Sequence, residues 1–295
     1  MAEKKRSNKV KKEKKKTTKR GPQYCESLLK TRTLNYNEYY LSAKEKLIYS
    51  LGAFIAGAAV ALIMYGGIGC DENGVPTITT YILDIIICCL AGIIAVKLFI
   101  PFIQEKLKTN RQKVIRQQFM DMLDSLSGSI ASGNNAAKAF ETSRYDLTMQ
   151  YGEESYIVKE VTLLLQGQQN YVNLDALLAD FGKRSGIAEI ENFAQVFSVS
   201  YRKGGDFGRV IRDTYDILYN KIAIEQEIQT KIAATKNEFN IILVMPIVIM
   251  LMMKMSGGDF ASNFGTASGI AGVTVGIILI AAAIYIARKI TNIGV

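Results

Sequence analysis

The chain has 295 residues, of which 49% are hydrophobic, and its 36 Lys and Arg against 27 Asp and Glu give a formal net charge of +9. It contains no histidine and no tryptophan. The missing imidazole excludes catalytic triads that use histidine, zinc sites with histidine ligands and imidazole acid–base catalysis. The composition therefore argues against most common enzyme sites, and we expect no catalytic residue, no cofactor and no metal.

A basic tail opens the chain. Residues 1–20 hold eleven Lys or Arg and two acidic residues, an excess that equals the net charge of the whole chain. The tail lacks interleaved aromatic residues, which favours attraction to the anionic cytoplasmic leaflet over binding of nucleic acid. We expect residues 1–34 to be a disordered cytoplasmic tail that contacts anionic lipids and no specific nucleic acid.

Four long apolar stretches follow in two pairs. A membrane-spanning helix needs about 20 mostly apolar residues. The sequence predicts spans near 47–69 and 79–103, within a first membrane region of residues 35–103 that starts with a juxtamembrane segment. It predicts two more near 240–260 and 268–287, within a second region of residues 239–295. Pro246 lies inside the third stretch, where a membrane helix tolerates it.

The charges that flank these stretches predict their orientation. Basic residues precede the first span, follow the second between 106 and 116, and close the chain as Arg288 and Lys289. The loops 70–78 and 256–267 carry only acidic charges. Because cytoplasmic loops are rich in Lys and Arg, we expect both termini in the cytoplasm. Asp84 and Lys97 lie near the ends of the second stretch, so we interpret them as interface residues rather than an ion path.

The insert between the two pairs, residues 104–238, is the only sizeable soluble region. It contains no proline, and its apolar residues recur at helical spacing, for example Phe119, Met122, Leu123 and Leu126. The insert shows no sustained alternation of apolar and polar residues, the pattern that is typical of strands. The fold class that we predict is all-α: a polytopic membrane protein with four transmembrane helices and a cytoplasmic bundle of about six helices.

Three breaks in the insert share a pattern in which a glycine ends one helix and a polar residue caps the next. We predict helical hairpins there, formed by Gly133, Asn134, Gly167, Gly204, Gly205 and Asp206. Arg184, Arg202 and Lys203 stand at helix ends beside glycines. They either complement helix dipoles or, if the ends are exposed, contact a partner protein.

Two short motifs invite an enzymatic interpretation and do not support it. Asp206-Phe207-Gly208 spells the kinase D-F-G, yet the chain has no histidine for a catalytic loop, and its pattern predicts no strands for a glycine-rich loop. Asp84 and Asp259 both lie toward the external side, but Ser256 stands where a G-x-G-D peptidase motif needs glycine. A phosphate-binding G-x-x-x-x-G-K-[ST] loop is also missing, so a partner must handle any ATP.

The run QFMDMLDSLSGSIASGNNAAKAFE from Gln118, and the run FGKRSGIAEIENFAQVFSVSYRKGGDFGRVI over 181–211, resemble the type II secretion system F domain. Two spans before this domain and two after it resemble the TadB-like branch of Tad (Flp-type) pilus systems. The resemblance covers roughly residues 35–295. Family members often have Gly-Gly-Asn-Leu where this chain has Gly204-Gly205-Asp206-Phe207.

This resemblance implies a multi-pass platform protein of the bacterial cytoplasmic membrane that carries out no covalent chemistry. The partners that it implies are a secretion ATPase, a paralogous platform protein and pilin subunits, in a homo- or hetero-oligomer. A small-solute transporter or channel with a cytoplasmic regulatory domain is the alternative. A transporter should have several polar residues in its spans and broken helices at matching positions in the two pairs of spans. Asp84, Lys97 and Pro246 are too few and do not stand at matching positions.

Overall fold

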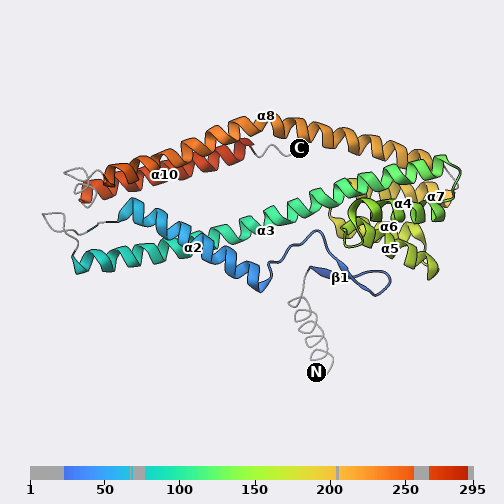
Figure 1. Cartoon of the computed structure of the whole chain (residues 1–295), viewed down its shortest axis with the longest axis horizontal. Helices are drawn as coiled ribbons and strands as arrows, with labels where there is room; N and C mark the ends of the chain where they lie inside the picture. The colour runs from blue at the N-terminus through green and yellow to red at the C-terminus, as the bar shows by residue number, and fades with distance from the viewer. Residues whose placement is uncertain (1–22, 67, 69–76, 204–205, 256–265, 292–295) are drawn as a thin grey trace, which may run out of the picture. The chain divides into compact units, whose positions relative to one another are not determined.

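A computed structural model describes residues 23–66, 68, 77–203, 206–255 and 266–291 of the chain (Figure 1). The chain divides into two compact units. One, the bundle unit, comprises Met1–Leu41 and Ile103–Ala223. The other, the span unit, comprises Ser42–Phe102 and Ile224–Val295. Each unit is described separately below.

The span unit holds four helical stretches that are long and apolar enough to cross a membrane. They are α2 (Ala43–Tyr65), the first part of α3 (Ile78–Ala131), the last part of α8 (Phe207–Met255) and α10 (Ala267–Thr291). The helix α2 begins where the backbone N–H of Ser42 donates to the Glu45 side chain at 2.8 Å. Four apolar helices confirm the membrane part of the predicted fold class, and the chain is a multi-pass membrane protein.

Small residues allow α2 and α3 to pack closely. A Cβ added to Gly57 would lie 2.6 Å from the Cβ of Ala95, and one added to Gly92 would lie 2.5 Å from the ring of Phe54. Both positions need glycine because any side chain there would overlap the facing helix. A hydrogen bond between the hydroxyls of Tyr65 and Thr274, 3.1 Å apart, joins α2 to α10.

The bundle unit packs the last part of α3 and the first part of α8 with four shorter helices (Figure 1). These are α4 (Ala136–Tyr151), α5 (Tyr156–Gln169), α6 (Leu174–Ser185) and α7 (Ala188–Lys203). Six helical segments confirm the predicted bundle. Its core is rich in phenylalanine: the ring of Phe119 lies 5.4 Å from Phe193, and Phe193 lies 5.6 Å from Phe197, between ring centroids.

The two long helices run through the boundaries that separate the soluble insert from the spans in the sequence. The helix α3 has 54 residues and α8 has 49, and neither breaks near residue 103 or residue 238. No glycine and no proline follows Pro101 until Gly128, so nothing local ends α3 where its composition changes from apolar to charged. The change from apolar to charged residues therefore marks where α3 passes from the span unit into the bundle unit, and not where one helix ends and another begins.

The N-terminal part of the bundle unit contains a short hairpin that the sequence analysis did not predict. The strands β1 (Tyr24–Glu26) and β2 (Arg32–Leu34) pair in antiparallel fashion, with Cys25 opposite Thr33. The expectation of disorder up to residue 34 is therefore wrong for residues 23–34, because Thr33 is buried and Leu29 and Leu34 pack against the core. Residues 1–22, with the basic run, lie outside the described residues.

Candidate functional site

Two of the predicted helical-hairpin residues, Gly133 and Asn134, lie at one end of the bundle unit. A cavity of about 660 Å³ opens there, lined by residues from the end of α3, the start of α4, the end of α5, the end of α7 and the start of α8. Its lining is Ile130, Gly133, Asn134, Asn135, Ala136, Ala137, Gln168, Tyr201 and Phe207. Ala131 is 28 residues along α3 from Ile103, which is about 42 Å at 1.5 Å per residue. This end of the bundle unit therefore lies far from Ile103, where α3 enters the unit. We call it the distal end.

At the first break, the backbone turns through glycine and asparagine. Gly133 has a φ of +87°, a conformation that L side chains rarely adopt. The Asn134 amide donates to Ser129 Oγ at 3.0 Å, which ties the turn back to α3. Asn135 then caps α4, its Oδ1 accepting the backbone N–H of Lys138 at 2.9 Å. The glycine and the cap occupy neighbouring positions, as the pattern predicts, with Asn135 and not Asn134 as the cap.

The second break differs from its prediction. Gly167 lies inside α5 and is buried, and a Cβ there would meet Leu177 Cδ1 at 2.4 Å. Its role is close packing of α5 against α6, so its assignment as the residue that ends the helix is wrong. Tyr171 takes the positive φ instead, at +59°, and its side chain is 98% exposed at the distal end. A tyrosine in this conformation is uncommon and carries a cost in strain.

Of the third break, Asp206 is described and Gly204 and Gly205 lie outside the described residues. The Oδ1 of Asp206 accepts the backbone N–H of Arg209 at 3.0 Å, so this carboxylate caps α8. Phe207 follows it and packs edge-on against Phe197, with ring centroids 6.2 Å apart. The Asp-Phe-Gly run is thus a helix start, with its aromatic ring directed into the bundle.

Two of the three cations proposed as partner contacts are exposed at the end of α7. Arg202 Nε donates to Asp175 Oδ2 at 2.6 Å, and Ser198 Oγ donates to the same oxygen at 3.0 Å. Burial raises the pKa of the Asp175 carboxyl, but the hydrogen bonds and the positive charge of Arg202 together outweigh burial and hold that pKa below its usual value. Lys203 follows Arg202 and is exposed as well.

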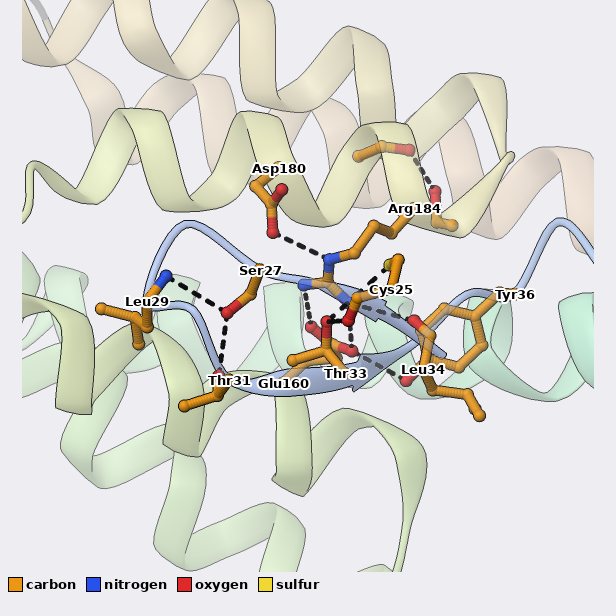
Figure 2. Close-up of polar contacts among 12 residues, drawn as sticks. Cys25, Ser27, Leu29, Thr31, Thr33, Leu34, Tyr36, Glu160, Asp180 and Arg184 are labelled. Carbon is orange, nitrogen blue, oxygen red and sulfur yellow. Dashed lines mark hydrogen bonds and ion pairs between the residues drawn. The ribbon is translucent and has the colours of Figure 1, made fainter. Parts of the chain in front are cut away.

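The third cation, Arg184, is not a surface residue, and its proposal as a partner contact is wrong. Its side chain is only 9% exposed and forms a two-armed ion pair with Glu160: Nη1 to Oε1 at 2.9 Å and Nη2 to Oε2 at 2.7 Å (Figure 2). Its Nε donates to Asp180 Oδ2 at 2.8 Å. Figure 2 shows the guanidinium enclosed between α6, Glu160 and the hairpin.

The same guanidinium holds the N-terminal segment, which we define as residues 23–41. Arg184 Nη1 donates to the carbonyl of Leu34 at 3.2 Å, and the backbone N–H of Tyr36 donates to the carbonyl of Arg184 at 2.9 Å (Figure 2). The hydroxyl of Tyr36 donates to Glu160 Oε1 at 2.9 Å. Burial is the main cause that raises the pKa of Tyr36 well above its usual value, and the neighbouring Glu160 carboxylate raises it further. Tyr36 therefore stays a hydrogen-bond donor throughout the physiological pH range.

Sequence reasoning missed Tyr36 and Glu160. Glu160 precedes Arg184 by 24 residues and Tyr36 precedes it by 148, and no spacing rule for helices or strands links residues so far apart. One signal was present: the run Asn35–Tyr40, in the segment interpreted only as juxtamembrane, holds three tyrosines. Aromatic residues dominate the energetics of cores and interfaces, so such a run indicates packing and not disorder.

The polar residues predicted within the spans do not come together as a site. Asp84 is half-buried and Lys97 exposed, 13 residues apart along α3, both within the span unit. Pro246 lines an apolar cavity of about 600 Å³ between α8 and α10, next to Gly269, Gly272 and Gly276. Among the described residues, no group of three or more His, Cys, Asp and Glu is placed to hold a metal ion.

A comparison with protein families adds one finding. Residues 122–254 match the family model described as Type II secretion system (T2SS), protein F. The match starts in α3, covers α4 to α7 with the distal end, and ends inside the span-unit part of α8. Comparisons with curated proteins and with solved structures found no significant match.

Proposed function

We propose that this chain is a platform protein in a bacterial cytoplasmic membrane, because residues 122–254 match the model of the T2SS protein F family, which is found in platform proteins of type II secretion and type IV pilus systems. In this role it links a secretion ATPase in the cytoplasm to pilin subunits in the membrane. It carries out no covalent chemistry itself, and its pilus system is of the Tad type.

The observation that supports this proposal most directly is the continuity of α3 and α8. Each helix belongs to the bundle unit at one end and to the span unit at the other. A helix that continues across the boundary transmits force and rotation better than two helices joined by a loop. A platform that couples a cytoplasmic motor to membrane-embedded subunits needs such a connection.

The distal end is our proposed contact for the ATPase. It presents Tyr171 to solvent, carries the exposed cations Arg202 and Lys203, and opens the cavity lined by Tyr201 and Phe207. Tyrosine and arginine are enriched among the residues that dominate binding at protein interfaces. Both termini lie in the cytoplasm in this proposal, which places the distal end on the ATPase side.

Site-specific photo-crosslinking in cells tests the proposal. A photoreactive phenylalanine analogue replaces Tyr171 at the distal end or Tyr145 on α4, which is 63% exposed and so serves as a matched aromatic control. We expect a secretion ATPase to be captured from position 171 and not from 145. Capture of no assembly component from either position, together with normal secretion and piliation after deletion of the gene, contradicts the platform function and favours the transporter alternative.

A further inference from the structure

The N-terminal segment makes more contacts with the bundle unit than a connecting tail needs. Its hairpin packs Leu29 and Leu34 against the core, and the ring of Tyr36 is almost fully buried. That ring lies edge-on to Tyr156 of α5 and to Phe181 of α6, with centroid distances of 5.7 and 6.4 Å. The segment therefore packs on a surface made by α5 and α6.

Polar contacts fix the segment in register on that surface. Arg184 uses its side chain to hold the carbonyl of Leu34 and its own carbonyl to hold the N–H of Tyr36 (Figure 2). An isolated two-stranded hairpin is only marginally stable in water. Since Glu160 and Arg184 are buried and neutralise each other, the hairpin gains both an apolar support and a fixed set of hydrogen-bond partners.

A second set of contacts follows toward the first span. The ring of Tyr39 lies 4.3 Å below the guanidinium of Arg111 on α3, at a position where Arg111 is buried. Asn37 lies against Gly186, where a Cβ would come within 2.8 Å of the Asn37 side chain. The turn after α6 is thus shaped to accept the segment, and the φ of +63° at Gly186 also requires glycine.

The segment ends where the first span begins. Five residues, 37–41, separate Tyr36 from Ser42, the cap of α2, and even a fully extended chain covers the six steps from Tyr36 to Ser42 in only about 21 Å. The bundle and span units are therefore joined by three connections along the chain: α3, α8 and this short tether. The helix α3 contains Pro101 next to its unit boundary at Phe102, and proline removes one helical hydrogen bond, which makes a helix easier to bend there.

We propose that the N-terminal segment is a brace that fastens the start of the first span to the bundle unit and limits bending of α3 at Pro101. Tyr36 and Arg184 are the positioning residues of the brace. With the segment docked, a load on the bundle reaches α2 as well as α3 and α8. With the segment released, residues 23–41 become a flexible linker, and α3 bends over a wider range.

The test uses the full chain in lipid nanodiscs and two readouts. The first is the labelling rate of Cys25, which is half-buried in the docked hairpin, by a water-soluble maleimide after Cys70, Cys88 and Cys89 are changed to serine. The second is the distribution of electron-spin distances between labels at Lys44 on α2 and Lys183 on α6, both exposed, in a cysteine-free background.

Tyr36→Ala is the test variant and Tyr40→Ala the control, since Tyr40 lies in the same segment but is 46% exposed. We expect Tyr36→Ala to raise the labelling rate of Cys25 at least about tenfold, because the N-terminal segment then opens away from the bundle unit. We also expect it to widen the distribution of distances between the labels at Lys44 and Lys183. We expect Tyr40→Ala to change neither. Tyr36→Phe keeps the ring and loses only the hydrogen bond to Glu160, so its effect should be intermediate.

Hydrogen exchange in α6 and α7 shows whether the bundle of each variant stays folded. Unchanged Cys25 labelling in Tyr36→Ala, with a folded bundle, overturns the docking. Faster labelling with an unchanged distance distribution overturns the bracing of α3. Neither readout involves an ATPase or pili, so these outcomes are separate from those that test the platform function.

Discussion

At the scale of single residues, the most consequential group is the buried guanidinium of Arg184. It binds two carboxylates and one backbone carbonyl. Burial lowers its pKa, but the hydrogen bonds and ion pairs with Glu160 and Asp180 together outweigh burial and raise that pKa. Removing one partner of a buried ion pair leaves the other charge without compensation, which costs more than the pair itself contributes. Exposed pairs on the same bundle contribute far less.

We therefore expect Arg184→Ala to lower the free energy of unfolding of the bundle unit by about 3–5 kcal/mol. The control is Lys138→Ala, which breaks an exposed pair with Glu141 at 3.2 Å and should cost less than about 1 kcal/mol. Hydrogen exchange of core amides in the full chain measures both. Equal effects of the two substitutions would show that the Arg184 network contributes no more than a surface pair.

Asp175 gives the bundle a dependence on pH. Its carboxyl has a lowered pKa in the folded state, so its contribution to stability is fully present above the unfolded-state pKa of about 3.9 and is lost as the pH falls through the lower folded-state pKa. We expect Asp175→Asn to be less stable than the wild type at pH 7 and to lose less stability between pH 5 and pH 2. Parallel pH profiles of the two proteins would contradict this assignment.

At the scale of elements, helix contacts in the bundle depend on glycines whose roles differ. Gly182 of α6 faces the backbone of α7, where an added Cβ would lie 3.0 Å from the Cα of Glu191. Backbone atoms cannot rotate away as a side chain can. Gly128 of α3 is helical as well, yet an added Cβ there meets nothing within 4 Å.

These two glycines make a matched pair of Gly→Ala substitutions. Gly182→Ala should destabilise the bundle by about 1–3 kcal/mol because α6 and α7 must move apart. Gly128→Ala should stabilise it by about 0.5–1 kcal/mol because alanine restricts the unfolded chain and favours helix. Thermal unfolding of the full chain tests both signs. A stabilising Gly182→Ala would mean that α6 and α7 separate without cost.

The elements were largely predictable from the sequence, and the contacts of the N-terminal segment were not. Helix periodicity and glycine positions are local signals, so the spans, the six-helix bundle and the turn at Gly133 could be predicted. Whether Gly167 ends a helix or packs inside one depends on Leu177 across the interface, which no local pattern reports. Arg184 has the position of a helix-end cation in the sequence, and only the fold brings Glu160 and Tyr36 to it.

At the scale of the whole molecule, the orientation of the four spans in the membrane decides on which side the bundle unit lies. The charge pattern predicts that the loop holding Cys70 is external and that Cys25 is cytoplasmic. In intact cells, an impermeant maleimide should label Cys70, or an added Ser262→Cys, and should label Lys203→Cys only after the membrane is permeabilised. Labelling of Lys203→Cys in intact cells would contradict the predicted topology and place the bundle unit outside the cell.

The attachment of the N-terminal segment also has a consequence for biosynthesis. Tyr36 leaves the ribosome 148 residues before Arg184, which is roughly 7–30 s at the usual 5–20 residues per second. During that interval the first two spans are made while the surface for Tyr36 does not yet exist. The hairpin can become ordered only after α6 has been translated and folded, so the N-terminal segment is synthesised early and is among the last parts of the described chain to reach its final structure.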